Sequence, residues 1–565
     1  MSVTRRVWFY MVTLITLGIF AAGVGQLLSL LFNSTFMSSY LAQVGRADFI
    51  QQQLSLGLAM LIIGGPLWFL FWRAIQRQVA GIPEEAGATI RNLFLNFILL
   101  VTALTGLTAA SNFLVWLMAG VPAARFSSGG LATLIVAGII WYYHRRVSEA
   151  DRYPSPIAKT LRRWYVYILA GFGLVWLAVS PVQLIYMAVI NISWGGALVH
   201  GPFWNNAVQQ SISWIVLGGL TWYFHWLRLA RGDFDSTLRQ VYFYLLAILG
   251  GAIAALVALT ISLYRVFIWV FGEVVTSAGP HFQFLGWAVP AILVGAAVWG
   301  YHQRLAQEEA AHVNEHSLSA QRVHIYLMSF LGLGALVSGL MILFGILLEL
   351  IINAAGTTVA ITPGWWQNQL SLCLALLLVG APMWLYYWRQ ALRRAEAAGM
   401  AEWRARSRRI FLYFIVGVSI VILVADLVNI VYQLINGMLQ GDFGINVLSN
   451  SRWSIETLVV AAPLLWYHWR IVRGEQRHGA EAAVVHKMVT ILIGAQSSDL
   501  VSKIEDKLGF KIRVLHQLGT ADEEITVLSD EEVDKLVMDV QSAPGAKVFL
   551  VAESGRIIVI PYQGK

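Results

Sequence analysis

The strongest constraint on the fold is a series of apolar runs that each extend for about 25 residues, as in "VWFYMVTLITLGIFAAGVGQLLSLLF" after Arg6. An α-helix of about 20 apolar residues crosses the hydrocarbon core of a bilayer. Of the 565 residues, 58% are hydrophobic and only 12% are charged, whereas globular domains carry about a quarter charged residues. Most of the chain is therefore predicted to lie in a membrane. The first run is too long for a signal peptide and is interpreted as a retained membrane helix.

The runs recur in pairs. The first member of each pair opens with arginine and aromatic residues: "RRVWFY", "RNLFLNF", "RRWYVY", "LRQVYFY", "QRVHIY" and "RRIFLY". The second member ends on "WFLFWR", "WYYHRR", "WYFHWLR", "WGYHQR", "WLYYWR" or "WYHWR". The arginines that align the copies are Arg6, Arg91, Arg163, Arg239, Arg322 and Arg409. Self-similarity at a nearly fixed period is typical of tandem repeats.

The predicted fold is an all-α polytopic membrane protein with 12 transmembrane helices, arranged as six tandem two-helix repeats, and a small C-terminal α/β domain. The membrane domain covers residues 1–482, and its hairpins cover about 1–83, 84–155, 156–232, 233–315, 316–402 and 403–478. The α/β domain covers 486–565.

The repeated aromatic and arginine motifs are predicted to mark one border of the membrane. Trp and Tyr favour the headgroup region, and an adjacent arginine reaches water. Twenty-six Lys and Arg residues lie on the side of the motifs, whereas the loops inside hairpins hold only Arg46, Arg125 and Arg452. Positive charge collects on the cytoplasmic side, so both termini are predicted to be cytoplasmic. The basic balance is assigned to the lipid bilayer as partner, and nucleic acid is not expected.

The C-terminal segment has a different pattern. "HKMVTILIG" and "FKIRVLHQL" read as strands, and "KVFLVAESGRIIVIPY" reads as a hairpin. Two helices are predicted between them, the second opened by a capping box of Ser529 and Glu532. The predicted order is β-α-β-α-β-β, and a protein partner is expected to bind through 486–565.

Four histidines occupy the same place in their repeats: His144, His225, His302 and His468. Imidazoles near a membrane surface can ligate haem or a chlorin. Phe71 and Tyr387 fill the place in the other two repeats, and phenylalanine cannot ligate. The favoured interpretation is an interfacial aromatic position, and no cofactor is predicted.

Polar side chains also lie deep in several apolar runs. Asp426 is the most deeply placed acid, and Asn429 follows it; the corresponding places hold Thr108, Ser111, Ser180 and Gln183. An intramembrane carboxylate is costly and is a candidate for a functional site, so these residues could form a polar path. The alternative is that they form hydrogen bonds between neighbouring helices.

Signatures of catalysis are missing from the sequence. It holds no Ser/His/Asp set, no paired catalytic carboxylates and no His-x-x-x-His motif, and its one cysteine, Cys373, excludes an intrachain disulfide. No metal site is predicted, and the chain is not expected to be an enzyme.

The repeated "R-x-x-x-Y" starts and "W-x-Y-H/W-R" ends resemble an uncharacterised bacterial multi-pass membrane repeat family that is catalogued as a domain of unknown function. The resemblance covers residues 1–475. It implies a multi-pass protein of the bacterial inner (plasma) membrane, and it brings no activity, substrate or site residues.

Two classes of function remain. The first is a non-enzymatic scaffold or sensor that presents the cytoplasmic domain to a partner. The second is a secondary transporter or channel with a polar path near Asp426. A solvent-filled cavity at Asp426 would favour transport, and an exposed apolar face on the C-terminal domain would favour the scaffold.

Overall fold

The structure is a computed structural model. It describes residues 3–562 apart from 37–45, 152–154, 194–201, 235, 273, 275, 310–317, 355–363, 442–443, 484–487, 494–497, 509, 517–528, 545–546 and 554–555. The chain divides into two compact units, Met1–Arg393 with Tyr432–Glu456, and Arg394–Val431 with Thr457–Lys565.

The first unit is built from long helices. In chain order these are α1 (Val3–Phe36), α2 (Arg46–Gly81), α3 (Thr89–Met118), α4 (Ser128–Ala150), α5 (Pro156–Ser193), α7 (Asn206–Trp222), α8 (Thr237–Val241), α9 (Leu249–Phe271), α10 (Ala278–Phe282), α11 (Leu285–Glu309), α12 (Leu318–Ala354), most of α13 (Trp365–Ala398) and α16 (Ile445–Asn450). Two 3₁₀ turns, η1 (Pro83–Gly87) and η2 (Ala123–Arg125), and two π-helical segments, η3 (Tyr223–Leu229) and η4 (Tyr242–Ile248), complete the list.

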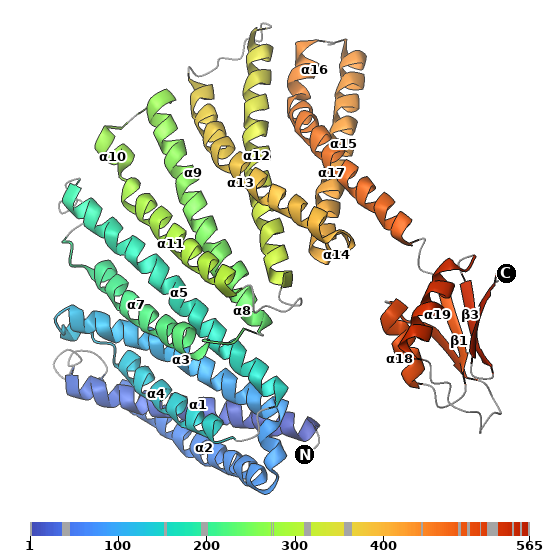
Figure 1. The fold of residues 1–565 in the computed structure, drawn as a ribbon. Coiled ribbons are helices and arrows are strands. Elements are labelled where there is room, and N and C mark those ends of the chain that lie inside the picture. Colours follow the sequence, from blue (N-terminus) through green and yellow to red (C-terminus); the bar gives the residue numbers. More distant parts are fainter. Residues whose placement is uncertain are drawn as a thin grey trace. The chain divides into compact units, whose positions relative to one another are not determined.

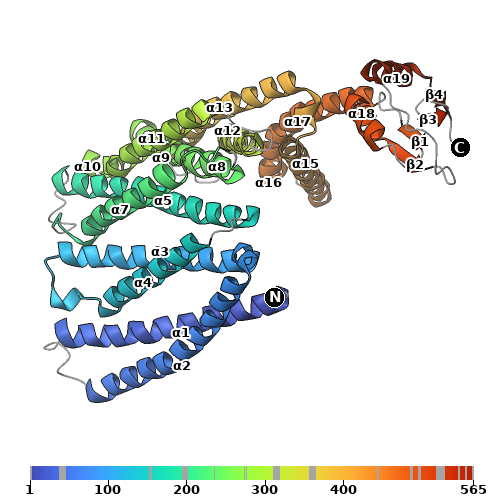
Figure 2. The same cartoon turned by 60° about the horizontal axis from the view of Figure 1, so that its bottom comes forward.

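Helices that follow one another pack as pairs. Helix α1 packs against α2, α3 against α4, α5 against α7, and α9 against α11. Neighbouring pairs then meet through contacts of α1 with α4, α3 with α5, and α5 with α11. Figures 1 and 2 show these pairs of the first unit side by side in chain order.

Glycine allows the paired backbones to approach closely. A Cβ atom on Gly251 of α9 would lie 2.8 Å from the carbonyl oxygen of Gly295 on α11, and one on Gly295 would lie 2.7 Å from the oxygen of Gly251. Small residues at such crossings are typical of membrane helices, because lipid provides no hydrophobic force to drive helices together and close van der Waals packing has to do so.

Nine helices within the described ranges are long and apolar enough to span a membrane. They lie at Val3–Thr35, Phe49–Gly81, Thr89–Met118, Pro156–Asn191, Thr237–Phe271, Ala278–Glu309, Ala320–Ala354, Trp365–Ala398 and Arg406–Gln440. Helices α4, α7 and α17 fall outside this set. The prediction of a largely helical chain with several helices that could span a membrane is thus confirmed, whereas twelve crossings in six repeats stay a prediction.

The second unit contains the short helix α14 (Met400–Trp403), much of α15 (Arg406–Gln440) and α17 (Arg452–Ala483), and the C-terminal domain. The domain consists of β1 (Met488–Ile493), α18 (Ser498–Leu508), β2 (Arg513–His516), α19 (Asp530–Ser542), β3 (Lys547–Glu553) and β4 (Arg556–Pro561). This is the predicted order of strands and helices.

The strands form one mixed sheet in the order β2-β1-β3-β4. Strand β1 pairs in parallel with both β2 and β3, and β4 is antiparallel to β3, as the predicted hairpin requires. The backbone N–H of Ser529 donates to the carboxylate of Glu532 at 2.8 Å, which places the predicted capping box at the start of α19.

One face of this sheet carries both helices. Val489 and Ile491 of β1 share a hydrophobic core with α18 and α19, and neighbouring side chains on β4, such as Val559, pack against it. Side chains alternate between the two faces of a strand, so Leu515, Ile558 and Ile560 lie on the opposite face. They are 38%, 46% and 43% exposed, respectively. The domain therefore has its own core on one side and an apolar surface on the other.

Candidate functional site

Ion pairs close the helix pairs at the end where the arginine motifs lie. In each one, an arginine in the first turns of one helix binds a carboxylate that follows the aromatic end motif of the helix that pairs with it. The described pairs are Arg6–Glu85, Arg91–Asp151, Arg163–Asp233, Arg239–Glu309 and Arg408–Glu475. An ion pair between the two helices of a pair thus recurs along the chain, in addition to the hydrophobic pattern.

The ion pair between Arg239 and Glu309 is an example in which both charged side chains are almost completely buried. Arg239 Nε donates to Glu309 Oε2 at 2.7 Å, Nη2 donates to Oε1 at 2.6 Å, and Nη1 donates to the carbonyl oxygen of Ala230 at 2.6 Å. The guanidinium lies 4.6 Å from the ring centroid of Trp226. The two charged side chains are only 5% and 9% exposed. Hydrogen bonds and stacking in this geometry compensate both charges for their lost hydration.

The sequence alone does not predict these ion pairs. The sequence predicts lipid headgroups as the anionic neighbours of the arginines, but the side chains of Arg91 and Arg408 are each 1% exposed and lie against carboxylates. In the last pair the buried residue is Arg408, whereas the repeat was aligned on Arg409, which is exposed. The sequence carries a signal for these pairs, because an acid follows the aromatic end motif of the second helix in each of these repeats.

The four aligned histidines are buried, and each forms the same type of hydrogen bond to its own helix backbone. In each, Nδ1 lies 2.8 or 2.9 Å from the carbonyl oxygen four residues earlier. A carbonyl only accepts, so Nδ1 carries the proton and Nε2 keeps its lone pair. Nε2 of His144 and of His225 has no hydrogen-bond partner within the described ranges. That atom would ligate a haem iron; at His144 the ring lies 5.5 Å from that of Trp72. His302 and His468 are likewise buried; the interfacial aromatic role stays the prediction for these positions, with a haem or chlorin as its alternative.

Asp426 is buried at 7% exposure, and the hydroxyl of Thr457 donates to its Oδ2 at 2.5 Å. Asn429, placed on the same helix face by the sequence, is exposed. The structure therefore gives Asp426 a hydrogen-bond partner on the neighbouring helix α17.

The other polar candidates lie in the first unit, where each has its own surroundings. Ser111 is 1% exposed, and its hydroxyl forms a hydrogen bond with that of Ser213 on α7. Ser180 is buried, whereas Thr108 and Gln183 are exposed. Other pairs join helices in the same way: Gln26 with Gln53, and Ser29 with Ser128. Hydrogen bonds between neighbouring helices are thus the observed use of several intramembrane polar residues.

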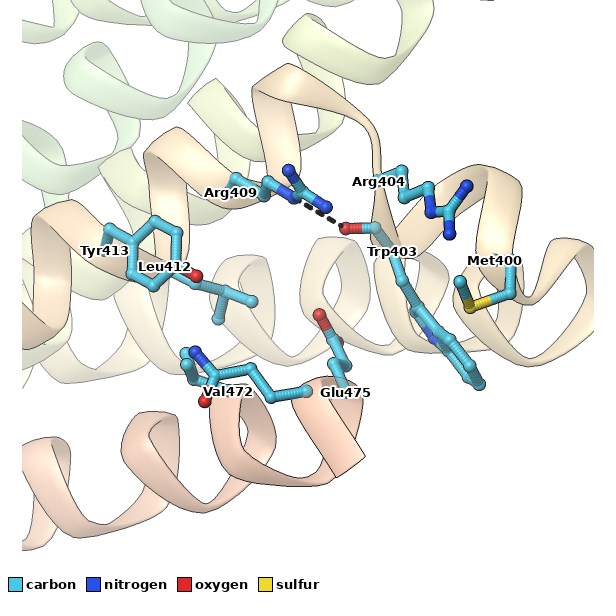
Figure 3. A pocket seen from close by; sticks show the side chains of 9 residues that line it. Met400, Trp403, Arg404, Arg409, Leu412, Tyr413, Val472 and Glu475 are labelled. Atoms are coloured by element: carbon cyan, nitrogen blue, oxygen red, sulfur yellow. Dashed lines mark hydrogen bonds between the residues drawn. The ribbon is translucent and has the colours of Figure 1, made fainter. Parts of the chain in front are cut away.

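A cavity of about 250 Å³ lies between α14, the start of α15 and α17. Figure 3 shows Arg404 and Arg409 on one side of it and Glu475 on the other, with Trp403 and Tyr413 also on its wall. Arg409 Nε donates to the carbonyl oxygen of Trp403 at 3.4 Å. The cavity therefore combines cationic and aromatic side chains at the end of the helices where the arginine motifs lie.

A second cavity, of about 330 Å³, lies between α11, α12 and α13 in the first unit. Its wall includes Trp299, His324, Tyr387 and several glutamines. His324 Nδ1 donates to the carbonyl oxygen of Tyr244 at 3.1 Å. Neither cavity includes Asp426. Where the structure describes the chain, no three His, Cys, Asp or Glu side chains converge as a metal site would require.

Comparison with known families gives one finding. A family profile described as "Domain of unknown function (DUF5671)" matches residues 6–129, 187–293 and 322–449, which together exceed half of the chain. Three matches in one chain indicate internal repetition. No curated protein and no solved structure matches it.

Proposed function

Because the chain belongs to the family described as a domain of unknown function (DUF5671), which carries no assigned activity, we propose its role from its own structure. We propose that it is a non-enzymatic membrane scaffold or sensor that presents its C-terminal α/β domain to a protein partner. The proposed place is the inner membrane of a bacterium, with both termini in the cytoplasm.

In this proposal α4, α7 with η3, and α17 also cross the bilayer, which completes six hairpins and twelve crossings. Two observations support it. Helices α4 and α7 pack against α3 and α5 as the other second helices pack against their partners, and α17 is tied to α15 by the ion pair of Arg408 with Glu475. The excess of Lys and Arg on one side supports the orientation.

The observation that carries the scaffold proposal is a set of exposed apolar side chains on the face of the C-terminal sheet opposite its core. Ile558 and Ile560 lie exposed on β4, and Leu515 lies exposed on β2. The opposite face holds the core of the domain, so these residues are not needed to fold it. Apolar side chains gathered on a surface mark a site for protein association. The closely packed glycine crossings and the ion pairs, in turn, are features of a rigid support.

The test is site-directed photo-crosslinking in native membranes, with the full chain carrying a photoreactive residue at Ile560 or, as control, at Met538. Met538 is 68% exposed but lies on α19, away from the open sheet face. The proposal expects one discrete crosslinked partner from position 560 and none from position 538, and it expects Ile558→Lys to abolish the adduct. If crosslinks are absent from position 560, or if they survive Ile558→Lys, the sheet face is not the docking surface.

Transport is the second candidate, and the buried carboxylate of Asp426 is the observation that favours it, because an acid within a membrane helix is costly to maintain. Proteoliposomes containing the native chain or Asp426→Asn would be compared for proton and solute flux, with Asn429→Ala as control. A flux that only the Asp426 variant loses would replace the scaffold proposal. Equal flux in all three preparations would exclude a path through Asp426.

A further inference from the structure

We propose that the cavity between α14, α15 and α17 binds the phosphate group of an anionic phospholipid. This inference goes beyond the scaffold proposal and does not depend on it, because a transporter or a scaffold could carry the same lipid site. Figure 3 shows the residues that carry the argument.

The charges around the cavity favour an anion. Arg404 and Arg409 line it and are exposed. The one acid on the wall, Glu475, is already occupied, because Arg408 donates to it through Nε at 2.9 Å and Nη2 at 2.5 Å. Two guanidinium groups therefore remain for a ligand. Arginine is the side chain best suited to phosphate, since its planar fork of N–H donors matches the phosphate oxygens.

The surroundings favour a lipid over a soluble phosphate. Below Arg409, one face of α15 continues through Tyr413, Ile420 and Val424, which are 51%, 42% and 56% exposed. A Cβ atom added at Gly417, between them, would meet nothing within 4 Å. An acyl chain can lie along this apolar strip while the headgroup stays at the arginines, and the ring of Tyr413 lies where aromatic residues meet headgroups.

The size of the cavity fits part of a lipid. Pockets that enclose a whole drug-sized ligand measure about 300–1,000 Å³, and this cavity of about 250 Å³ is smaller. It accommodates a phosphate with its nearest glycerol atoms and leaves the chains outside, in the bilayer.

The experiment uses the purified full chain in detergent and measures retained phosphatidylglycerol by native mass spectrometry, with phosphatidylcholine as the zwitterionic comparison. Three variants are compared: Arg404→Gln with Arg409→Gln, the same pair replaced by lysine, and Arg473→Gln. Arg473 is exposed on α17 and does not line the cavity, so it controls for surface charge.

We expect the double glutamine variant to lose at least about tenfold in affinity for phosphatidylglycerol, since each of the two cations near a membrane surface contributes about fivefold. The lysine variant should retain part of the affinity, and Arg473→Gln should equal the native chain. Unchanged melting temperatures establish that all variants fold.

Three results would overturn the inference. Equal retention of phosphatidylglycerol by the native chain and the double glutamine variant would place the lipid elsewhere. Displacement of the lipid by equimolar glycerophosphoglycerol or inorganic phosphate would show that the site takes a soluble anion. An equal preference for phosphatidylcholine would show that the arginines do not select charge.

Discussion

Replacing Arg239 by methionine should destabilise the membrane domain far more than an equivalent change at the surface. The substitution keeps much of the length and apolar stem of the side chain but removes its charge. It leaves the carboxylate of Glu309, whose side chain is 9% exposed, without its two guanidinium hydrogen bonds. The carbonyl oxygen of Ala230 loses a donor at the same time.

The expected magnitude follows from this burial. Removing one partner of a buried ion pair costs about 3–5 kcal/mol, because an uncompensated charge stays in a medium of low polarity. The matched control is Arg145→Met, since Arg145 and Glu149 form an ion pair whose side chains are 37% and 50% exposed. An exposed pair of this i,i+4 type contributes about 0.3–0.5 kcal/mol.

The assay is equilibrium unfolding of the full chain in mixed micelles by increasing fractions of dodecyl sulfate, followed by tryptophan fluorescence. We expect Arg239→Met to lower the free energy of unfolding by at least about 3 kcal/mol. The double variant Arg239→Met with Glu309→Leu should recover most of that loss, because neither charge then remains buried. The reasoning is refuted if Arg239→Met costs no more than Arg145→Met, or if the double variant is less stable than the single one.

Three further predictions concern other parts of the membrane domain. Hydrogen bonds from Arg6 hold the pKa of Glu85 below its ordinary value of 4.5. The native chain should therefore have a higher free energy of unfolding than Glu85→Gln above pH 4.5, and this difference should vanish as the pH falls through the lowered pKa. Measuring the unfolding free energy of both chains across acid pH tests this, and a difference that stays constant would contradict it. Gly251→Leu should cost about 1–3 kcal/mol through overpacking, whereas Gly250→Leu, with nothing within 4 Å of its Cβ position, should cost less in the same assay. Ser111→Ala should cost about 0.6 kcal/mol, and a double-mutant cycle with Ser213→Ala should assign that loss to their mutual hydrogen bond.

Local pattern was sufficient for the elements themselves. Hydrophobic periodicity and turn residues predicted the order of the C-terminal domain, and Ser529 with Glu532 predicted where α19 begins. These features depend on residues only a few positions apart, so the sequence displays them directly. The length of each apolar run predicted the membrane helices for the same reason.

Contacts between residues that are far apart in the sequence could not be predicted from local patterns. Arg91 was assigned to the lipid border from its neighbours in the chain, yet its partner Asp151 lies 60 residues further on. The nine-tenths burial of Asp426 and the exposure of Asn429, three positions later, were likewise set by packing against α17. Helical spacing shows that two residues lie on one side of a helix, but it does not show which of them the neighbouring helix buries.

Composition and short-range periodicity were enough to predict long apolar helices followed by a C-terminal α/β domain, because these features depend on residues that are close together in the chain. Tertiary structure decided which arginines became buried ion pairs, which polar side chains found partners on adjacent helices, and which arginines stayed open beside a cavity. Those outcomes depend on the close approach of helix backbones, and the approach is a property of whole packed surfaces.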